Sequence, residues 1–159
     1  MGEDHAAVAQ AERPRSEAAE GDPVRQAGGG STLQLVLPWP PTVNTYWRHV
    51  VIGKQVRVLI SERGREYRYH VGRLCLLPSI AGWARENSGK PLAVYIGCYP
   101  PDSRRRDLDN LPKSLLDALT EAKVLRDDSD IWDLRLIRWV RSEPPGRIVV
   151  KLRQFEWKL

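Results

Sequence analysis

Apolar and polar positions along this chain form two kinds of pattern, which predict strands and amphipathic helices. Runs of strand length, rich in β-forming residues, lie at residues 33–37, 92–99, 131–140 and 147–152. Pro38 and Pro100 each follow one of these runs, and proline ends a strand because it removes a backbone hydrogen-bond donor. Two stretches, residues 61–77 and 110–123, have helical spacing instead.

The two predicted helices are defined by their caps and by their apolar faces. Ser61 is the candidate N-cap of the first helix, and Pro78 is its candidate stop. Asn110 opens the second helix, and Pro112 is acceptable in a first helical turn. The apolar faces consist of Tyr67, Val71 and Leu74 in the first helix and of Leu111, Leu115, Leu119 and Ala122 in the second. This pattern predicts an α/β (α+β) fold in which a small mixed β-sheet and two main helices form a single domain.

The first thirty residues differ in composition from the rest of the chain. Residues 1–30 carry almost no large apolar side chains, so they cannot bury enough surface to offset the entropy of ordering. We expect a disordered N-terminal tail at residues 1–30 and one folded domain at residues 31–159. The tail has a net charge of −3 and the remainder a net charge of +8. A basic domain of this kind favours a polyanionic partner such as nucleic acid.

The composition argues against several classes of protein. No apolar run approaches the roughly 20 residues needed to span a bilayer, and no secretory signal is visible at the N-terminus. Cys75 and Cys98 are the only cysteines, which rules out a disulfide framework and a thiolate zinc site. We therefore expect a cytoplasmic protein with reduced thiols and no membrane partner.

The segment from Arg104 to Lys113 carries the most chemical information. Asp107 and Asp109 lie two positions apart, so on an extended backbone both carboxylates point to the same face. Two carboxylates at close range repel each other unless a cation lies between them, and hard oxygen ligands suit Mg²⁺ or Mn²⁺. A third carboxylate, from Asp127 or Asp128, would join them if the chain runs back along the second helix.

Cations surround this acidic pair. Arg104, Arg105 and Arg106 directly precede it, and the forked guanidinium group matches phosphate oxygens. Lys113 falls in the first turn of the predicted helix, where the helix dipole disfavours a positive charge, so its position there points to a function. We predict a phosphate-binding site beside a metal.

Ordinary structural roles explain the same residues. Asp and Asn are common N-cap residues, so Asp109 or Asn110 could serve only to cap the second helix. The Asp127-Asp128 pair has the composition of a turn. The arginines and acids together would also form a self-neutralising surface cluster. From the residues alone, both explanations stay open. Aromatic side chains are likewise more often core residues than stacking platforms for bases, and Trp47, which lies near Asn44 and beside Arg48, is the best stacking candidate.

Several motifs combine in a specific order: Arg106-Asp107-Leu108-Asp109-Asn110, Lys113, Leu116-Asp117-Ala118-Leu119 and Asp127-Asp128-Ser129, and upstream Pro40-Pro41-Thr42-Val43-Asn44, Tyr46-Trp47-Arg48 and Gly64-Arg65-Glu66-Tyr67-Arg68. Through these motifs, the sequence from about Leu33 to Leu152 resembles the RusA family of Holliday junction resolvases. The resemblance implies that residues 31–159 form a RusA-like endonuclease domain that acts as a homodimer on branched DNA, the four-way junction, with Mg²⁺ as cofactor. A phage or prophage origin is typical of the family.

The resemblance also implies roles for single residues. Asp107, Asp109 and Asp128 match the metal-binding carboxylates of the family, and Lys113 matches its essential lysine. Arg106 matches a basic residue tied to DNA contact. We extend this DNA-binding role to Arg104, Arg105, Lys113, Asn44, Trp47 and Arg48. Pro112, directly before the lysine, departs from the family pattern.

Two other functions compete with a junction-resolving nuclease. The first is a catalytically inactive branched-DNA-binding protein of the same fold, against which the presence of all four catalytic side chains argues. The second is a glycosyltransferase whose acidic pair holds a metal and a nucleotide, which would need a larger domain than this chain supplies.

Overall fold

The computed structural model describes residues 31–157, so the predicted tail at residues 1–30 lies outside the described residues. The elements, in chain order, are β1 (Leu33–Pro38), α1 (Val43–Tyr46), β2 (Trp47–Ile52), β3 (Gln55–Ile60), α2 (Glu62–Leu74), α3 (Pro78–Asn87), β4 (Leu92–Tyr99), the 3₁₀ turn η1 (Leu108–Asn110), α4 (Pro112–Glu121), the 3₁₀ turn η2 (Asp128–Asp130), β5 (Ile131–Arg138) and β6 (Arg147–Gln154). The α+β class predicted from the sequence is confirmed.

Four strands form the main sheet in the order β1-β6-β4-β5. The pairs β1–β6 and β4–β6 are antiparallel, whereas β4 and β5 are parallel, so the sheet is mixed as predicted. Parallel neighbours need a crossover connection, and α4 supplies it between β4 and β5. This crossover carries both acidic segments that the sequence singles out.

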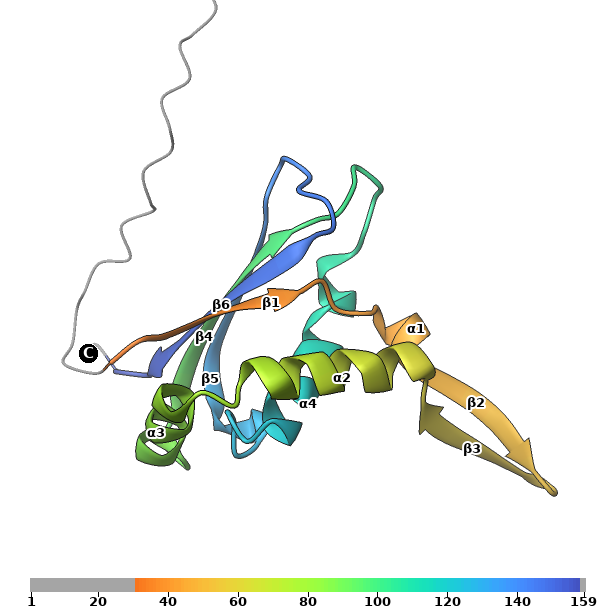
Figure 1. The fold of residues 1–159 in the computed structure, drawn as a ribbon, viewed down its shortest axis with the longest axis horizontal. Coiled ribbons are helices and arrows are strands. Elements are labelled where there is room, and N and C mark those ends of the chain that lie inside the picture. Colours follow the sequence, from red (N-terminus) through yellow and green to blue (C-terminus); the bar gives the residue numbers. More distant parts are fainter. Residues whose placement is uncertain (1–30, 158–159) are drawn as a thin grey trace, which may run out of the picture.

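One face of the main sheet holds the hydrophobic core. Alternate positions of β4, from Leu92 to Cys98, are buried against the helices, as are alternate positions of β6. Val71 of α2 and Leu115 of α4 are completely buried in the same cluster. Figure 1 shows α2 and α3 lying across the front of the sheet. Among residues 31–157 no helix is long and apolar enough to cross a membrane.

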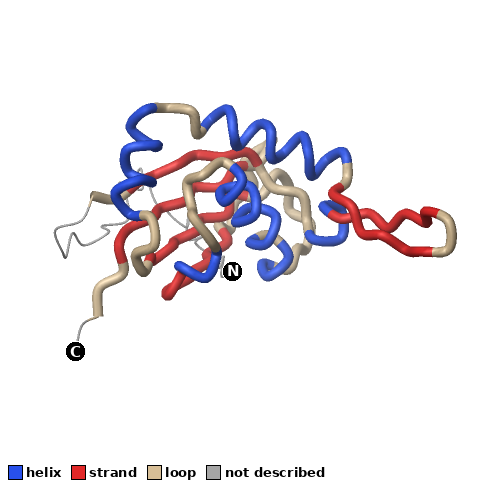
Figure 2. The backbone as a smooth tube through the Cα atoms, turned by 90° about the horizontal axis from the view of Figure 1, so that it is seen from below, coloured by secondary structure: helices blue, strands red, loops and turns tan. Residues whose placement is uncertain are grey.

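A two-stranded antiparallel sheet, β2 with β3, lies apart from the main sheet. Figure 2 shows it projecting from one end of the molecule, beyond the helices. Its apolar side chains are largely exposed, with Val51 at 72% and Val56 at 67%. The sequence predicts an irregular segment at residues 42–50 and a turn or a short hairpin at residues 53–57. The structure corrects the first, because Val43–Tyr46 form α1 and Trp47 begins a strand, and it confirms a hairpin at the second. Gly53 lies in the turn with a positive φ of 64°.

The helix boundaries differ from those expected. The first predicted helix ends at Leu74, and Pro78 does not stop it but occupies the first turn of a third long helix, α3. The second begins at Pro112 rather than Asn110, since residues 108–110 form η1. Asp107 therefore has an extended backbone, with φ −82° and ψ 128°, but Asp109 lies in a 3₁₀ turn. The extended pairing assumed for the two acids is wrong.

Candidate active site

The 3₁₀ turns η1 and η2 both pack against α4 and bring distant acidic residues beside one helix. The loop that follows β4 leads into η1, and η2 lies directly before β5. Both turns contact α4, and η1 also contacts β5. The crossover between two parallel strands therefore places both predicted acidic segments around α4.

The carboxylates of Asp107 and Asp109 are exposed and, within residues 31–157, make no hydrogen bond or ion pair. Asp107 is the residue before η1, yet its side chain does not cap the turn. Leu111 occupies the N-cap position of α4, so neither Asp109 nor Asn110 caps that helix. The capping role that competes with metal binding in the sequence is therefore absent from this part of the structure.

The acidic residues around η2 have partners. Asp127 accepts a hydrogen bond from the backbone N–H of Ser129 at 2.9 Å, and hydrogen bonds from Ser129 lower the pKa of the Asp127 carboxyl. Asp130 is buried and pairs with Arg126, with Nη2 and Oδ1 2.5 Å apart. Asp128 instead faces α4, where its Oδ2 lies 3.6 Å from Nζ of Lys113.

Lys113 connects the start of α4 to the end of the crossover. Its Nζ lies 2.9 Å from Oδ1 of Asp117, one turn further along the helix. The hydrogen bond to Asp117, followed in strength by the charges of Asp117 and Asp128, raises the pKa of the Lys113 ammonium. The ten residues of α4 keep the first turn of the helix away from its last. Lys113 can therefore contact Asp128 only because the chain after α4 runs back along the helix, a path that the sequence alone did not decide.

A cavity of about 350 Å³ opens beside this lysine. Trp47, Lys113 and Asp128, all predicted site residues, line it together. Tyr46 lines it as well, and its hydroxyl is buried without a hydrogen-bond partner in the described structure. Asn44 and Arg48 are exposed on either side of this aromatic pair, on α1 and β2.

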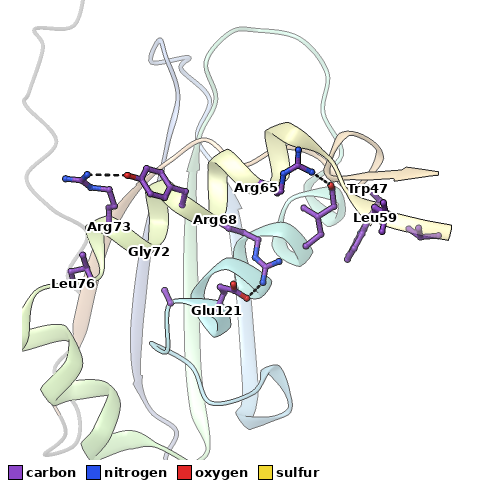
Figure 3. A pocket seen from close by; sticks show the side chains of 12 residues that line it. Trp47, Leu59, Arg65, Arg68, Gly72, Arg73, Leu76 and Glu121 are labelled. Carbon is purple, nitrogen blue, oxygen red and sulfur yellow. Dashed lines mark hydrogen bonds and ion pairs between the residues drawn. The ribbon is translucent and has the colours of Figure 1, made fainter. Parts of the chain in front are cut away.

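Sequence reasoning missed several polar residues of this region. Arg68 of α2 forms an ion pair with Glu121 of α4, and both line the cavity. Figure 3 shows this ion pair in the neighbouring pocket, which is lined by α2, β3 and the end of α4. Asp117 lines it too and holds Lys113. Arg68 and Asp117 both lie in motifs that carry the family resemblance, and the spacing of Lys113 and Asp117 places opposite charges one helical turn apart.

The three arginines before the acidic pair have different surroundings. The Arg104 side chain is 84% exposed, although its Nε lies 3.7 Å from Oδ2 of Asp102, and Arg105 is also exposed. Arg106 is mostly buried and donates two hydrogen bonds to the carboxylate of Asp102, at 2.6 and 2.7 Å, while it lies over the ring of Trp39. These bonds hold the pKa of the Asp102 carboxyl well below its usual range. Arg104 and Arg105 are thus open to a phosphate, whereas Arg106 anchors the loop.

The donor chemistry of this region fits a hard divalent cation. Asp107 and Asp109 offer unpaired carboxylate oxygens, which are the ligands that Mg²⁺ binds. Among residues 31–157, however, no group of three or more Asp, Glu, His or Cys side chains lies close enough to hold one metal ion. The third predicted ligand, Asp128, is engaged by Lys113. A shared three-carboxylate site thus stays a prediction.

The fold and the site together define a small basic α+β protein in which unpaired carboxylates lie beside exposed cations. The chain belongs to the endodeoxyribonuclease RusA family, whose pattern matches residues 38–153. A crossover junction endodeoxyribonuclease of Enterobacteria phage HK97 is 37% identical over 123 residues, covering 77% of this chain and 95% of that protein. Relatives of the same name from phage 82 and Escherichia coli K12 are 39% and 38% identical over 109 residues, 68% of this chain and 83% of each relative.

Proposed function

We propose that this protein is a Mg²⁺-dependent, structure-specific endodeoxyribonuclease that resolves four-way DNA junctions by paired symmetric nicks in DNA recombination and repair. The observation that carries the proposal is the placement of unpaired Asp107 and Asp109 at one turn beside α4, with Lys113 and Asp128 facing each other at the same helix. Membership of the RusA family and the names of the relatives support it.

Asp107, Asp109 and Asp128 would hold the metal in this proposal, with Mn²⁺ as a possible substitute. A divalent ion held there would supply Lewis-acid chemistry, polarising the scissile phosphate and activating water for its hydrolysis. Lys113 carries a stable positive charge because Asp117 and Asp128 surround its ammonium group. That charge would stabilise the negative charge that develops on the phosphate or the leaving oxygen.

The DNA-binding role of the neighbouring residues follows from their exposure. Arg104 and Arg105 extend into solvent and would bind the phosphate backbone. Trp47 is partly exposed beside Lys113 and would contact distorted bases, with Asn44 and Arg48 flanking it. Arg106 would contribute chiefly by fixing the loop through Asp102.

We further propose that the protein acts as a homodimer. A four-way junction has two-fold symmetry, so two symmetric nicks need two active sites related by a two-fold axis. The projecting β2–β3 sheet supports this arrangement, because its exposed valines form an apolar surface that a second copy would cover. The phage relatives support an origin in a phage or prophage. We place its action on DNA in the cytoplasm as part of the same proposal.

A cleavage assay tests the proposal directly. The purified protein is incubated with a synthetic four-way junction, with and without Mg²⁺, beside the Asp109→Asn variant. We expect symmetric nicks only with wild type and metal, and junction binding by both proteins. Binding without nicks under any divalent metal would favour the catalytically inactive DNA-binding alternative and reject the enzymatic one.

A further inference from the structure

The face of the main sheet that points away from the core is aromatic and basic. Side chains alternate along a strand, so Tyr95, Gly97 and Tyr99 of β4 lie on the face opposite Val94, Ile96 and Cys98. The neighbouring strands place further charged residues in register on that face: Arg147, Lys151 and Arg153 from β6, and Asp133 and Arg135 from β5. None of these residues belongs to the core or to the candidate active site.

Gly97 is the centre of an aromatic cluster on this face. A methyl group at Gly97 would lie 3.5 Å from Cε2 of Tyr99, 3.6 Å from Nε1 of Trp139 and 3.6 Å from Cε1 of Tyr95. Glycine weakens a strand interior, and it often marks a place where another group approaches the backbone closely. We call these three rings around Gly97 the aromatic platform.

Cations lie against the platform. The rings of Tyr99 and Trp139 are stacked, with centroids 5.2 Å apart and planes at 16°. The guanidinium carbon of Arg147 is 4.0 Å from the centre of the Tyr99 ring, and Nζ of Lys151 is 5.9 Å from that of Tyr95. A cavity of about 180 Å³ continues from Tyr95 and is lined by Lys151 and Arg153.

The platform borders the loop that carries the candidate site. The backbone N–H of Trp139 donates to the carbonyl of Cys98 at 2.9 Å, which fixes Trp139 at the end of β4 where that loop begins. Nη2 of Arg138 donates to the carbonyl of Arg104 at 3.1 Å. A DNA strand whose phosphates are bound at Arg104 and Arg105 could therefore continue directly onto the outer face of the sheet.

We propose that the aromatic platform binds an unpaired or splayed segment of the DNA substrate, whose bases stack on the rings while Arg147, Lys151 and Arg153 hold the phosphates. The inference rests on the proposed function, since it extends the same DNA beyond the scissile phosphate. Aromatic rings interleaved with cations are the usual means of binding single-stranded nucleic acid without sequence readout.

The charges of this face favour DNA over a second copy of the chain. Four cations stand on it against two carboxylates, Asp133 and Glu143, which pair with Arg135 and Arg147. Lys151 and Arg153 form no ion pair within the described residues. Packing two such faces about a two-fold axis would bring like charges together, whereas a phosphate backbone complements them.

Direct binding measurements without metal test the inference. A fluorescein-labelled single-stranded oligonucleotide and a labelled four-way junction are titrated with the full chain in EDTA. The proteins are wild type, W139A, W139F and the control W132A, which removes an exposed tryptophan that contacts Phe155 instead. We expect W139A to bind the single strand about tenfold more weakly, the value of one lost base stack, while W139F and W132A match wild type.

A second readout isolates stacking from general loss of structure. Oligonucleotides with 2-aminopurine should lose fluorescence on binding to wild type and W139F but keep it with W139A. If wild type binds the junction, equal affinity and equal quenching for W139A and wild type would overturn the DNA-binding role of the aromatic platform. That result would leave the proposed function standing. A wild type that binds neither DNA overturns the proposed function too. A W139A protein that becomes monomeric yet keeps full DNA affinity assigns the face to a second copy and overturns the platform.

Discussion

The two 3₁₀ turns beside α4 have similar compositions but opposite surroundings. Every acid of the later turn is engaged: Asp127 by a backbone N–H, Asp128 by Lys113 and Asp130 by Arg126. Within the described residues, Asp107 and Asp109 at the earlier turn engage nothing. Asp127 and Asp130 are bound by groups of their own turn or of the residues just before it, so they hold the fold together. Over residues 31–157, Asp107 and Asp109 lack such partners, and Asp128 pairs only with the half-exposed Lys113, so these three carboxylates are the candidate ligands. The residue spacing alone does not make this distinction.

The largest expected effect is on cleavage by variants of the earlier turn. Asp107→Asn and Asp109→Asn each remove a carboxylate that only a bound ion would use, so we expect junction cleavage to fall by at least about 10³-fold. Junction binding should persist, because removing a carboxylate near the DNA phosphates removes a repulsion and takes away no contact to the DNA. The matched control is Asp127→Asn in the later turn, which should cleave at a rate close to wild type. If Asp127→Asn is the inactive variant instead, Asp127 and not Asp128 supplies the third carboxylate.

Lys113 links the two regions, and its replacement should reduce cleavage next most strongly. Lys113→Met removes the charge that would stabilise the transition state, for an expected loss of about 10²–10³-fold in single-turnover cleavage. Its ion pairs are solvent-exposed and contribute only about 0–1 kcal/mol to stability, so the variant should unfold in urea near the wild-type midpoint. A variant that cleaves normally would leave the lysine a purely structural role.

The buried acid of the later turn should matter for stability. In Asp130→Asn the side chain loses its charge-assisted hydrogen bonds to Arg126, which we expect to cost about 1.5–3 kcal/mol in the free energy of unfolding. Equilibrium urea denaturation measures this loss. The same substitution at Asp109, which has no partner in the described structure, should change the free energy of unfolding by less than about 0.5 kcal/mol.

The smallest effect concerns the loop that leads into the earlier turn. Hydrogen bonds from the Arg106 side chain and the Arg104 backbone N–H depress the pKa of Asp102 in the folded protein. A depressed pKa means that this stabilisation is present above the pKa of the unfolded chain, about 4, and is lost as the pH falls below it. Denaturation from pH 2 to pH 6 should therefore show a weaker acid dependence for Asp102→Asn than for wild type. Parallel profiles would mean that the pair does not anchor the loop.

The sequence predicts elements better than it predicts partners. The strand at residues 92–99 and the helix that begins near Asn110 follow from local periodicity, which the core then satisfies. The β2 strand was missed because its apolar residues face solvent, so no buried alternation marks it. Residue spacing does not reveal turn geometry. That geometry decides that Arg106 pairs with Asp102, and that Asp128 and not Asp127 faces Lys113. Tyr99 meets Trp139 only because β5 lies beside β4, which is a property of strand order.

The burial of α4 has a consequence for how this protein fails under stress. Leu115 and Leu119 are wholly enclosed, and the helix they anchor is the shared support of both acidic turns. A slight lifting of this one helix would therefore misplace the ligands at both its ends at once, before the sheet itself comes apart. On heating, cleavage activity should be lost at a lower temperature than the cooperative unfolding of the domain. The rate of cleavage would then report how stably α4 packs on the sheet.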